Sequence, residues 1–129
     1  MKEGLQPKEP LMAYTEKFQA MSDAARARVD EVAPEDVDAL IANGAIALDI
    51  RDPDEHAKTH IPGSINISRG KLEMNVEGII TNLDATILCY CNAYNRGALS
   101  AASLRDMGYA NAKFIGGGLN AWKKLHEEA

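Results

Sequence analysis

The sequence predicts an α/β protein of three layers, in which a central, mainly parallel β-sheet has helices on both faces. Short apolar runs of strand length alternate along the chain with segments of helical character. This order is typical of a parallel sheet whose strands are joined by crossover helices. One run, residues 86–90, is almost wholly apolar, as expected of a strand buried on both faces. With 129 residues, 46% of them hydrophobic, the chain can bury a core of its own.

The first 28 residues are expected to lie outside the α/β domain, which we place at residues 29–129. Residues 1–10 are polar and predict a loosely attached tail. Residues 11–28 predict an amphipathic helix, because apolar side chains recur at three- and four-residue steps. Those side chains are Leu11, Tyr14, Phe18, Met21 and Ala25. This helix either packs across the body of the same domain or contacts a partner or a second subunit.

Capping and turn residues set the expected elements of the domain. Pro34 is favourable at a first helical position, and the glycine of Asn43-Gly44 suits the end of the helix that follows. Asp52 and Pro53 begin a further short helix by the same rules. In chain order we expect a strand at 29–33, a helix at 34–43, a strand at 45–50, a short helix from 52, a strand at 64–67, a helix at 68–74, a connection over 75–85, the strand at 86–90, a helix at 97–107, a strand at 112–115 and a closing helix from 119.

The strand at 86–90 leads into the residues that carry the chemistry. Cys91 comes at its end, and four residues separate it from Arg96. Open α/β sheets bind ligands at the carboxyl ends of their strands. A tight loop that enters a helix turns backbone N–H groups inward, and the helix dipole and Arg96 add positive potential. Because these effects favour thiolate over thiol, we expect Cys91 to be a nucleophile at neutral pH.

Composition and charge argue against several classes of protein. The formal net charge of −5 argues against a nucleic-acid partner, which normally needs a basic face. No apolar run approaches the roughly 20 residues that span a bilayer. The first ten residues lack the apolar core of a secretory signal, so the cytoplasm is the expected compartment. The only cysteines, Cys89 and Cys91, are too close in sequence for a fold-spanning disulfide and fit a reducing compartment.

Two residues near Cys91 have competing interpretations. Cys89 is expected to fill core space as a small apolar residue; a disulfide with Cys91 would be strained, and a metal site lacks further cysteines or well-spaced histidines. Arg51 follows the second strand of the domain and reaches the same sheet edge as Cys91. It either pairs with a nearby carboxylate or adds positive potential to the pocket.

Several stretches of the chain resemble the signatures of the rhodanese-like domain family. Residues 48–56 and 60–67 resemble its two N-terminal signatures, and residues 91–97 resemble its active-site loop. Its C-terminal signature resembles residues 107–109 together with 117–122. The stretches follow one another in the family's order and spacing, from about Val29 to Leu125. The resemblance implies a rhodanese-like fold and leaves only the N-terminal helix and tail uncovered.

What the resemblance implies is sulfur transfer without a metal or organic cofactor. In the family, the cysteine that matches Cys91 takes sulfur from a donor such as thiosulfate or a persulfide and becomes a persulfide. An acceptor such as cyanide or a thiol then removes that sulfur. Cys91 is thus the expected catalytic residue, with loop N–H groups stabilising the anionic persulfide and a guanidinium holding an oxyanion donor. The expected substrate-binding residues are Asn92, Ala93, Tyr94, Asn95, Arg96, Gly97 and Arg51.

The length and composition of the loop add two expectations. A cysteine followed by four residues and an arginine resembles the sulfur-transfer branch, whereas relatives with one more residue handle phosphate or arsenate. Family loops also often carry glycine at the positions of Tyr94 or Asn95, where a left-handed backbone is easier. Tyrosine adopts that conformation poorly, so Tyr94 is either strained or lies over the pocket mouth as an apolar wall.

Two alternative functions remain open from the sequence. The first is a non-catalytic or regulatory module that recruits a protein partner, or forms a homodimer, through the N-terminal helix. Retention of both Cys91 and Arg96 argues against it, because an inactive module needs neither. The second is a small phosphatase or arsenate reductase, which the short loop disfavours.

Overall fold

The structure is a computed structural model that describes residues 14–128. It begins with α1 (Glu16–Arg28) and contains five strands. The remaining elements are β1 (Asp30–Val32), η1 (Pro34–Asp36), α2 (Val37–Ala42), β2 (Ile46–Asp49), α3 (Pro53–Lys58), β3 (Ile65–Asn66), η2 (Arg69–Lys71), α4 (Leu72–Ile79), β4 (Ile87–Tyr90), α5 (Asn95–Asp106), β5 (Ala112–Ile115) and α6 (Gly118–Glu128).

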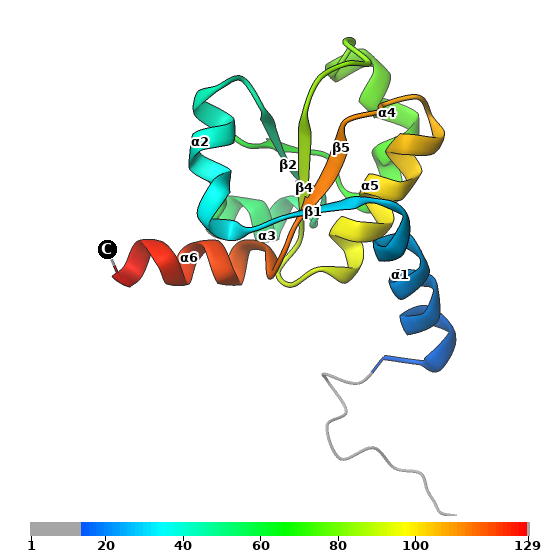
Figure 1. The fold of residues 1–129 in the computed structure, drawn as a ribbon, viewed down its shortest axis with the longest axis horizontal. Coiled ribbons are helices and arrows are strands. Elements are labelled where there is room, and N and C mark those ends of the chain that lie inside the picture. Colours follow the sequence, from blue (N-terminus) through cyan, green and yellow to red (C-terminus); the bar gives the residue numbers. More distant parts are fainter. Residues whose placement is uncertain (1–13, 129) are drawn as a thin grey trace, which may run out of the picture.

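The five strands form one sheet in the order β1-β5-β4-β2-β3, and every pairing between neighbours is parallel. Figure 1 shows α2 and α6 on one side of this sheet and α4, α5 and α1 on the other. The predicted fold class is therefore confirmed. Within the described residues, no helix is long and apolar enough to cross a membrane.

Alternate side chains of β4 belong to two hydrophobic clusters, one on each face of the sheet. Ile87 and Cys89 point into the cluster beneath α4 and α5, whereas Leu88 and Tyr90 point into the cluster beneath α2 and α6. All four side chains are fully buried. This burial on both faces explains why residues 87–90 are apolar without alternation. It also holds in place the strand that leads directly to Cys91.

Three helix boundaries differ by two or more residues from those expected from the sequence. One is the start of α1 at Glu16, where the helix was expected over residues 11–28. The segment 75–85 was expected to be a connection, but α4 continues through Asn75 and Gly78 to Ile79. The reason is that Leu72, Val76 and Ile80 recur at four-residue steps and are buried, so packing outweighs the low helix propensity of asparagine and glycine. Helix α5 also begins at Asn95 rather than at residue 97.

The segment 14–28, called here the N-terminal arm, packs against the domain, mainly on α5. Its buried side chains are Ser22 and Ala25, and Phe18 is half-buried. The expected apolar face is wrong at Met21, which is 62% exposed. Small side chains at residues 22 and 25 let α1 approach α5 closely, and this rotates Met21 outward. The predictions for Leu11 and for residues 1–10 concern residues outside those that the structure describes.

Candidate active site

Cys91 lies directly after β4, at the carboxyl edge of the sheet, and its side chain is nearly buried at 3% exposure. The residues from Cys91 to Gly97, called here the Cys91 loop, lead into α5. Two carbonyl oxygens of this loop face the start of α6. The N–H of Leu119 donates to the Cys91 carbonyl at 2.8 Å, and that of Asn120 donates to the Asn92 carbonyl at 3.1 Å.

The amide groups of the same loop are left free. Among residues 14–128, no oxygen accepts a hydrogen bond from the backbone N–H groups of residues 92–97. The last three of these N–H groups belong to the first turn of α5, whose dipole places partial positive charge there. With its carbonyls engaged by α6 and its amides unpaired, the loop presents a set of donors suited to an anion beside Cys91.

Two glycines make this geometry possible. Gly118 has a φ of +57°, and a Cβ at this position would overlap the carbonyl oxygens of Cys91 and Ala93. Gly97 lies against β4, where a Cβ would come within 3.3 Å of the Cys89 carbonyl oxygen. Glycine therefore allows both α6 and α5 to approach the loop and its strand closely. The role of Gly97 in the structure is this close approach.

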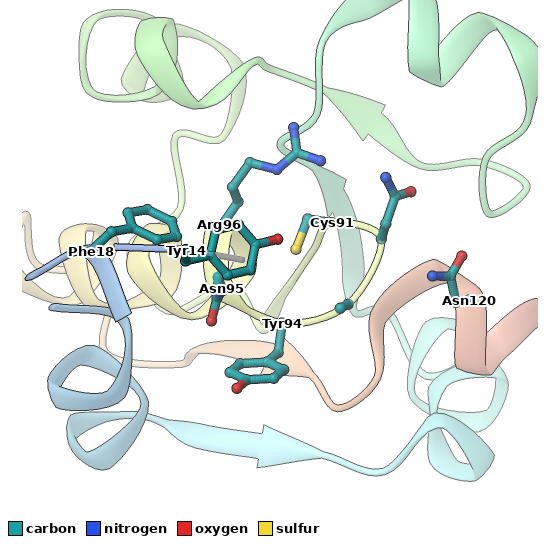
Figure 2. A pocket seen from close by; sticks show the side chains of 9 residues that line it. Tyr14, Phe18, Cys91, Tyr94, Asn95, Arg96 and Asn120 are labelled. Atoms are coloured by element: carbon teal, nitrogen blue, oxygen red, sulfur yellow. The ribbon is translucent and has the colours of Figure 1, made fainter. Parts of the chain in front are cut away.

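A pocket of about 520 Å³ opens beside Cys91. Figure 2 shows Phe18 and Tyr14 on one side of the Cys91 sulfur and Asn120 on the other. The loop itself forms the floor, and the Arg96 side chain extends along the rim. The described residues that line the pocket are Tyr14, Phe18, Cys91, Asn92, Ala93, Tyr94, Asn95, Arg96 and Asn120.

Arg96 is paired with a carboxylate of α3. Its Nη1 and Nη2 atoms lie 3.3 and 3.4 Å from the two carboxylate oxygens of Glu55. The hydrogen bond from Arg96 holds the pKa of Glu55 below its usual range. Burial opposes the charge on Arg96, but the bond to Glu55 outweighs it and raises the pKa of the guanidinium. The rim of the pocket therefore holds an ion pair rather than an isolated positive charge.

Arg51 lies behind the loop rather than in the pocket lining. It is 3% exposed and forms a bidentate pair with fully buried Asp49, with N–O distances of 2.9 and 2.7 Å. Its Nη1 donates to the Asn92 side chain at 3.2 Å. Of the two interpretations given above, the structure has the ion pair with a carboxylate, and Arg51 contacts the loop through Asn92.

A third group completes this buried network. The Nδ1 atom of His56, a residue with a 19% exposed side chain, lies 2.8 Å from the Asp49 carboxylate. Burial opposes ionisation of Asp49, but the hydrogen bonds from Arg51 and His56 outweigh it and hold its pKa below the usual range. The Asp49 carboxylate thus holds Arg51 in place, and Arg51 in turn contacts the Cys91 loop through the side chain of Asn92.

Tyr94 and Asn95 connect the loop to the N-terminal arm. Tyr94 has a φ of −147°, and no residue other than glycine has a positive φ in the described chain, so the expected backbone strain is absent. The Tyr94 ring packs against the guanidinium of Arg26 at 4.2 Å and points away from the Cys91 sulfur in Figure 2. The buried Asn95 side chain accepts a hydrogen bond from the Ser22 hydroxyl at 2.6 Å.

The predicted site residues therefore fall into two groups. Residues 91–96 come together around one pocket, whereas Gly97 and Arg51 support the loop from behind. Sequence reasoning missed Glu55, Asn120 and the aromatic pair Tyr14 and Phe18. Asn120 had a signal, because it follows β5, which is adjacent to β4 and ends at the same edge. The aromatic pair is spaced four residues apart, but nothing in the sequence places it against the loop.

The Cys89 side chain is fully buried in the core, and burial raises the pKa of its thiol. This agrees with the expected role as a small apolar core residue. In the part of the chain that the structure describes, no group of three or more histidine, cysteine or acidic side chains could hold a metal ion.

Comparison with known proteins gives one family and a consistent set of relatives. The family model for the rhodanese-like domain matches residues 33–125. The thiosulfate sulfurtransferase GlpE of Pseudomonas entomophila is 33% identical over 95 residues, which cover 74% of this chain and 85% of that protein. Its counterpart from Pseudomonas aeruginosa PAO1 is 32% identical over 95 residues, covering 74% of this chain and 84% of that protein.

Two solved structures extend the comparison. A Rhodopseudomonas palustris protein of unknown function, described as a possible tyrosine phosphatase, is 30% identical with a TM-score of 0.79 and covers 95% of this chain and 97% of its own. This coverage leaves too few residues unmatched to omit α1. The polysulfide-sulfur transferase homodimer of Wolinella succinogenes is 27% identical with a TM-score of 0.69, covering 85% of this chain and 84% of its own.

Proposed function

The chain belongs to the rhodanese-like domain family, and we propose that it is a sulfurtransferase in which Cys91 carries the transferred sulfur. The observation that carries this proposal is a buried cysteine followed by residues 92–97, whose backbone N–H groups donate to no oxygen among the described residues. The relatives named as thiosulfate sulfurtransferases support the same reaction class. Donors are thiosulfate or persulfides, and acceptors are thiols or cyanide.

The reaction consists of two displacements at sulfur. The Cys91 thiolate attacks the outer sulfur of thiosulfate; a new bond to Sγ forms, the sulfur–sulfur bond of the donor breaks, and sulfite leaves with the electron pair. A thiolate acceptor then attacks the outer sulfur of the Cys91 persulfide. The bond to Sγ breaks, its electrons return to Cys91 as thiolate, and the acceptor leaves as a persulfide. Splitting the transfer in this way requires a good nucleophile that is also a good leaving group.

Stabilisation of the anionic sulfur falls mainly on the backbone. Both arginines near the loop are paired with carboxylates, Arg51 with Asp49 and Arg96 with Glu55, so neither offers an uncompensated charge. The amides of residues 92–97 have no such competitor among the described residues. Fixed N–H groups stabilise a developing anion without reorganisation. Arg96 then serves to orient an oxyanion donor at the rim.

Intact mass spectrometry tests the proposal directly. Incubation with thiosulfate followed by desalting should add one sulfur atom to the protein, and Cys91→Ser should abolish this addition. Cys89→Ala is the matched control, because Cys89 lies in the same cluster but is fully buried beneath the site. It should still gain the sulfur. A sulfur that is located by peptide mapping on Cys89, or that is retained in Cys91→Ser, would show the assignment to be wrong.

A phosphatase is the second candidate, because one solved relative is described as a possible tyrosine phosphatase. The four-residue spacing between Cys91 and Arg96 disfavours it, since the family members that handle phosphate have one more residue in this loop. Hydrolysis of p-nitrophenyl phosphate decides the matter. Turnover that depends on Cys91, without uptake of sulfur from thiosulfate, would replace the sulfurtransferase by a phosphatase.

We propose the division into residues 1–28 and a domain at 29–129, which is supported by a family match that begins at residue 33. We place the protein in the cytoplasm, because a nucleophilic Cys91 must stay reduced. Self-association through the N-terminal helix is a further proposal, supported by the homodimeric Wolinella relative. Gel filtration of the full chain and of a Met21→Glu variant tests it, since Met21 lies exposed on that helix.

A further inference from the structure

Two aromatic side chains of the N-terminal arm lie beside the reactive sulfur. Tyr14 precedes α1 and Phe18 lies in its first turn, and both line the pocket that contains Cys91. Their rings are 5.1 Å apart and tilted by 45° to each other, a favourable aromatic pair. The matched region of the family model begins at residue 33, so this wall of the pocket comes from outside it.

The arm is fixed to the Cys91 loop at two points. Ser22 is fully buried, and its hydroxyl donates at 2.6 Å to the side chain of Asn95, which is 8% exposed. Arg26 covers the Tyr94 ring, with its guanidinium carbon 4.2 Å from the ring centre. These contacts lie one and two helical turns beyond Phe18, so they hold the aromatic pair at a set place relative to Cys91.

The charge and polarity of the side chains that line the pocket indicate which kind of molecule they contact. Of the nine described residues that line the pocket, Arg96 alone is charged, and it is paired with Glu55. The aromatic side therefore offers apolar contact rather than charge. The volume of about 520 Å³ lies within the range of pockets that hold small organic molecules, and it exceeds the needs of an ion such as cyanide.

From these observations we infer that Tyr14 and Phe18 are specificity-determining residues, which select thiol acceptors with an apolar organic body over small hydrophilic ones. The inference rests on the proposed function, since it concerns the step in which a thiol discharges the Cys91 persulfide. The thiolate reaches the outer sulfur with its organic part against the two rings. Tyr14 is 57% exposed, so its ring has a free face for this contact.

Single-turnover discharge of the persulfide tests the inference. The protein is loaded with thiosulfate, desalted and mixed with benzyl mercaptan or 2-mercaptoethanol, two thiols of similar acidity but different bulk. The loss of the added sulfur is followed by intact mass. The ratio of the two rate constants should favour benzyl mercaptan in the wild type. Each aromatic contact removed should lower this ratio roughly two- to tenfold.

Two variants and one control keep the result clear. Tyr14→Ala removes an exposed ring at little risk to folding, and Phe18→Leu removes the second ring while keeping an apolar side chain against the domain. Both should lower the ratio, whereas Ala27→Gln, at an exposed position of the same helix, should leave it at the wild-type value. A ratio that stays constant in both variants, or that falls equally in Ala27→Gln, overturns the inference and leaves the sulfurtransferase intact. Failure of the wild type to take up sulfur overturns both.

Discussion

Asp49→Ala is expected to lower the free energy of unfolding by about 3–5 kcal/mol, because it leaves a buried guanidinium without its partner. Asp49 is fully buried and Arg51 is 3% exposed, so water cannot replace the lost carboxylate at low cost. Two short bonds, of 2.9 and 2.7 Å, would be lost at once. The Thr59 carbonyl and the Asn92 side chain would remain as neutral acceptors for Arg51.

Urea denaturation at pH 7, followed by circular dichroism, gives the magnitude. Asp106→Ala is the matched control, because Asp106 pairs with Arg28 at the surface, where the two side chains are 66% and 51% exposed. Exposed pairs contribute about 0.2–1 kcal/mol, so this variant should lie close to the wild type. If Asp49→Ala lost no more stability than Asp106→Ala, the buried network would not hold the loop, and the reasoning would fail.

The same pair predicts how stability depends on pH. The pKa of Asp49 is lower in the folded protein than its ordinary value of 3.8. Its contribution is therefore fully present above that value and is lost as the pH falls through the lower folded pKa. The stability difference between the wild type and Asp49→Asn should narrow as the pH falls below about 4. A difference that widens on acidification would contradict this sign.

Three further predictions concern the loop and its contacts. Gly118→Ala places a Cβ on two carbonyl oxygens of the Cys91 loop, so it should cost about 1–3 kcal/mol in urea denaturation and slow persulfide formation by about tenfold or more. Glu55→Gln keeps a side-chain oxygen for capping α3 but frees Arg96, so the KM for thiosulfate should fall roughly two- to fivefold; a higher KM would mean that the carboxylate orients the guanidinium. Ser22→Ala removes the buried donor to Asn95 and should cost about 1–2 kcal/mol; unchanged stability would refute the clamp between arm and loop.

Most of the sheet could be predicted from the sequence, because its signals are local. A strand buried on both faces has an apolar sequence, and Pro34 and Gly44 mark helix boundaries by their own backbone preferences. The error at α4 has the opposite origin. Its last turn contains Gly78, and only the burial of Val76 and Ile80 against the rest of the fold keeps it helical. Helix propensities, which are local, do not reveal tertiary packing of this kind.

The candidate site likewise has some residues that could be predicted from local sequence and others that could not. The Cys91 loop is one continuous segment, so its residues could be predicted together from the end of the strand and the start of the helix. The partner of its arginine could not, because Glu55 precedes Arg96 by 41 residues. Sequence spacing also left open whether Arg51 faces a ligand or a carboxylate. In the structure the Arg51 guanidinium pairs with Asp49, two residues before it, and does not line the pocket.

The N-terminal arm contributes both to the position of the Cys91 loop and to the wall of the pocket. The loop needs its amides to face the pocket, and three elements hold it in that position from different sides. Helix α6 engages its carbonyls, the Asp49–Arg51 pair supports it from behind, and Ser22 of the arm fixes the side chain of Asn95. The first two elements lie within the match to the family model, and the arm lies before it. Because the arm also lines the pocket, a change in its side chains can alter the choice of acceptor while the amides of the loop stay in place. The test of Tyr14 and Phe18 therefore compares two acceptors rather than total turnover.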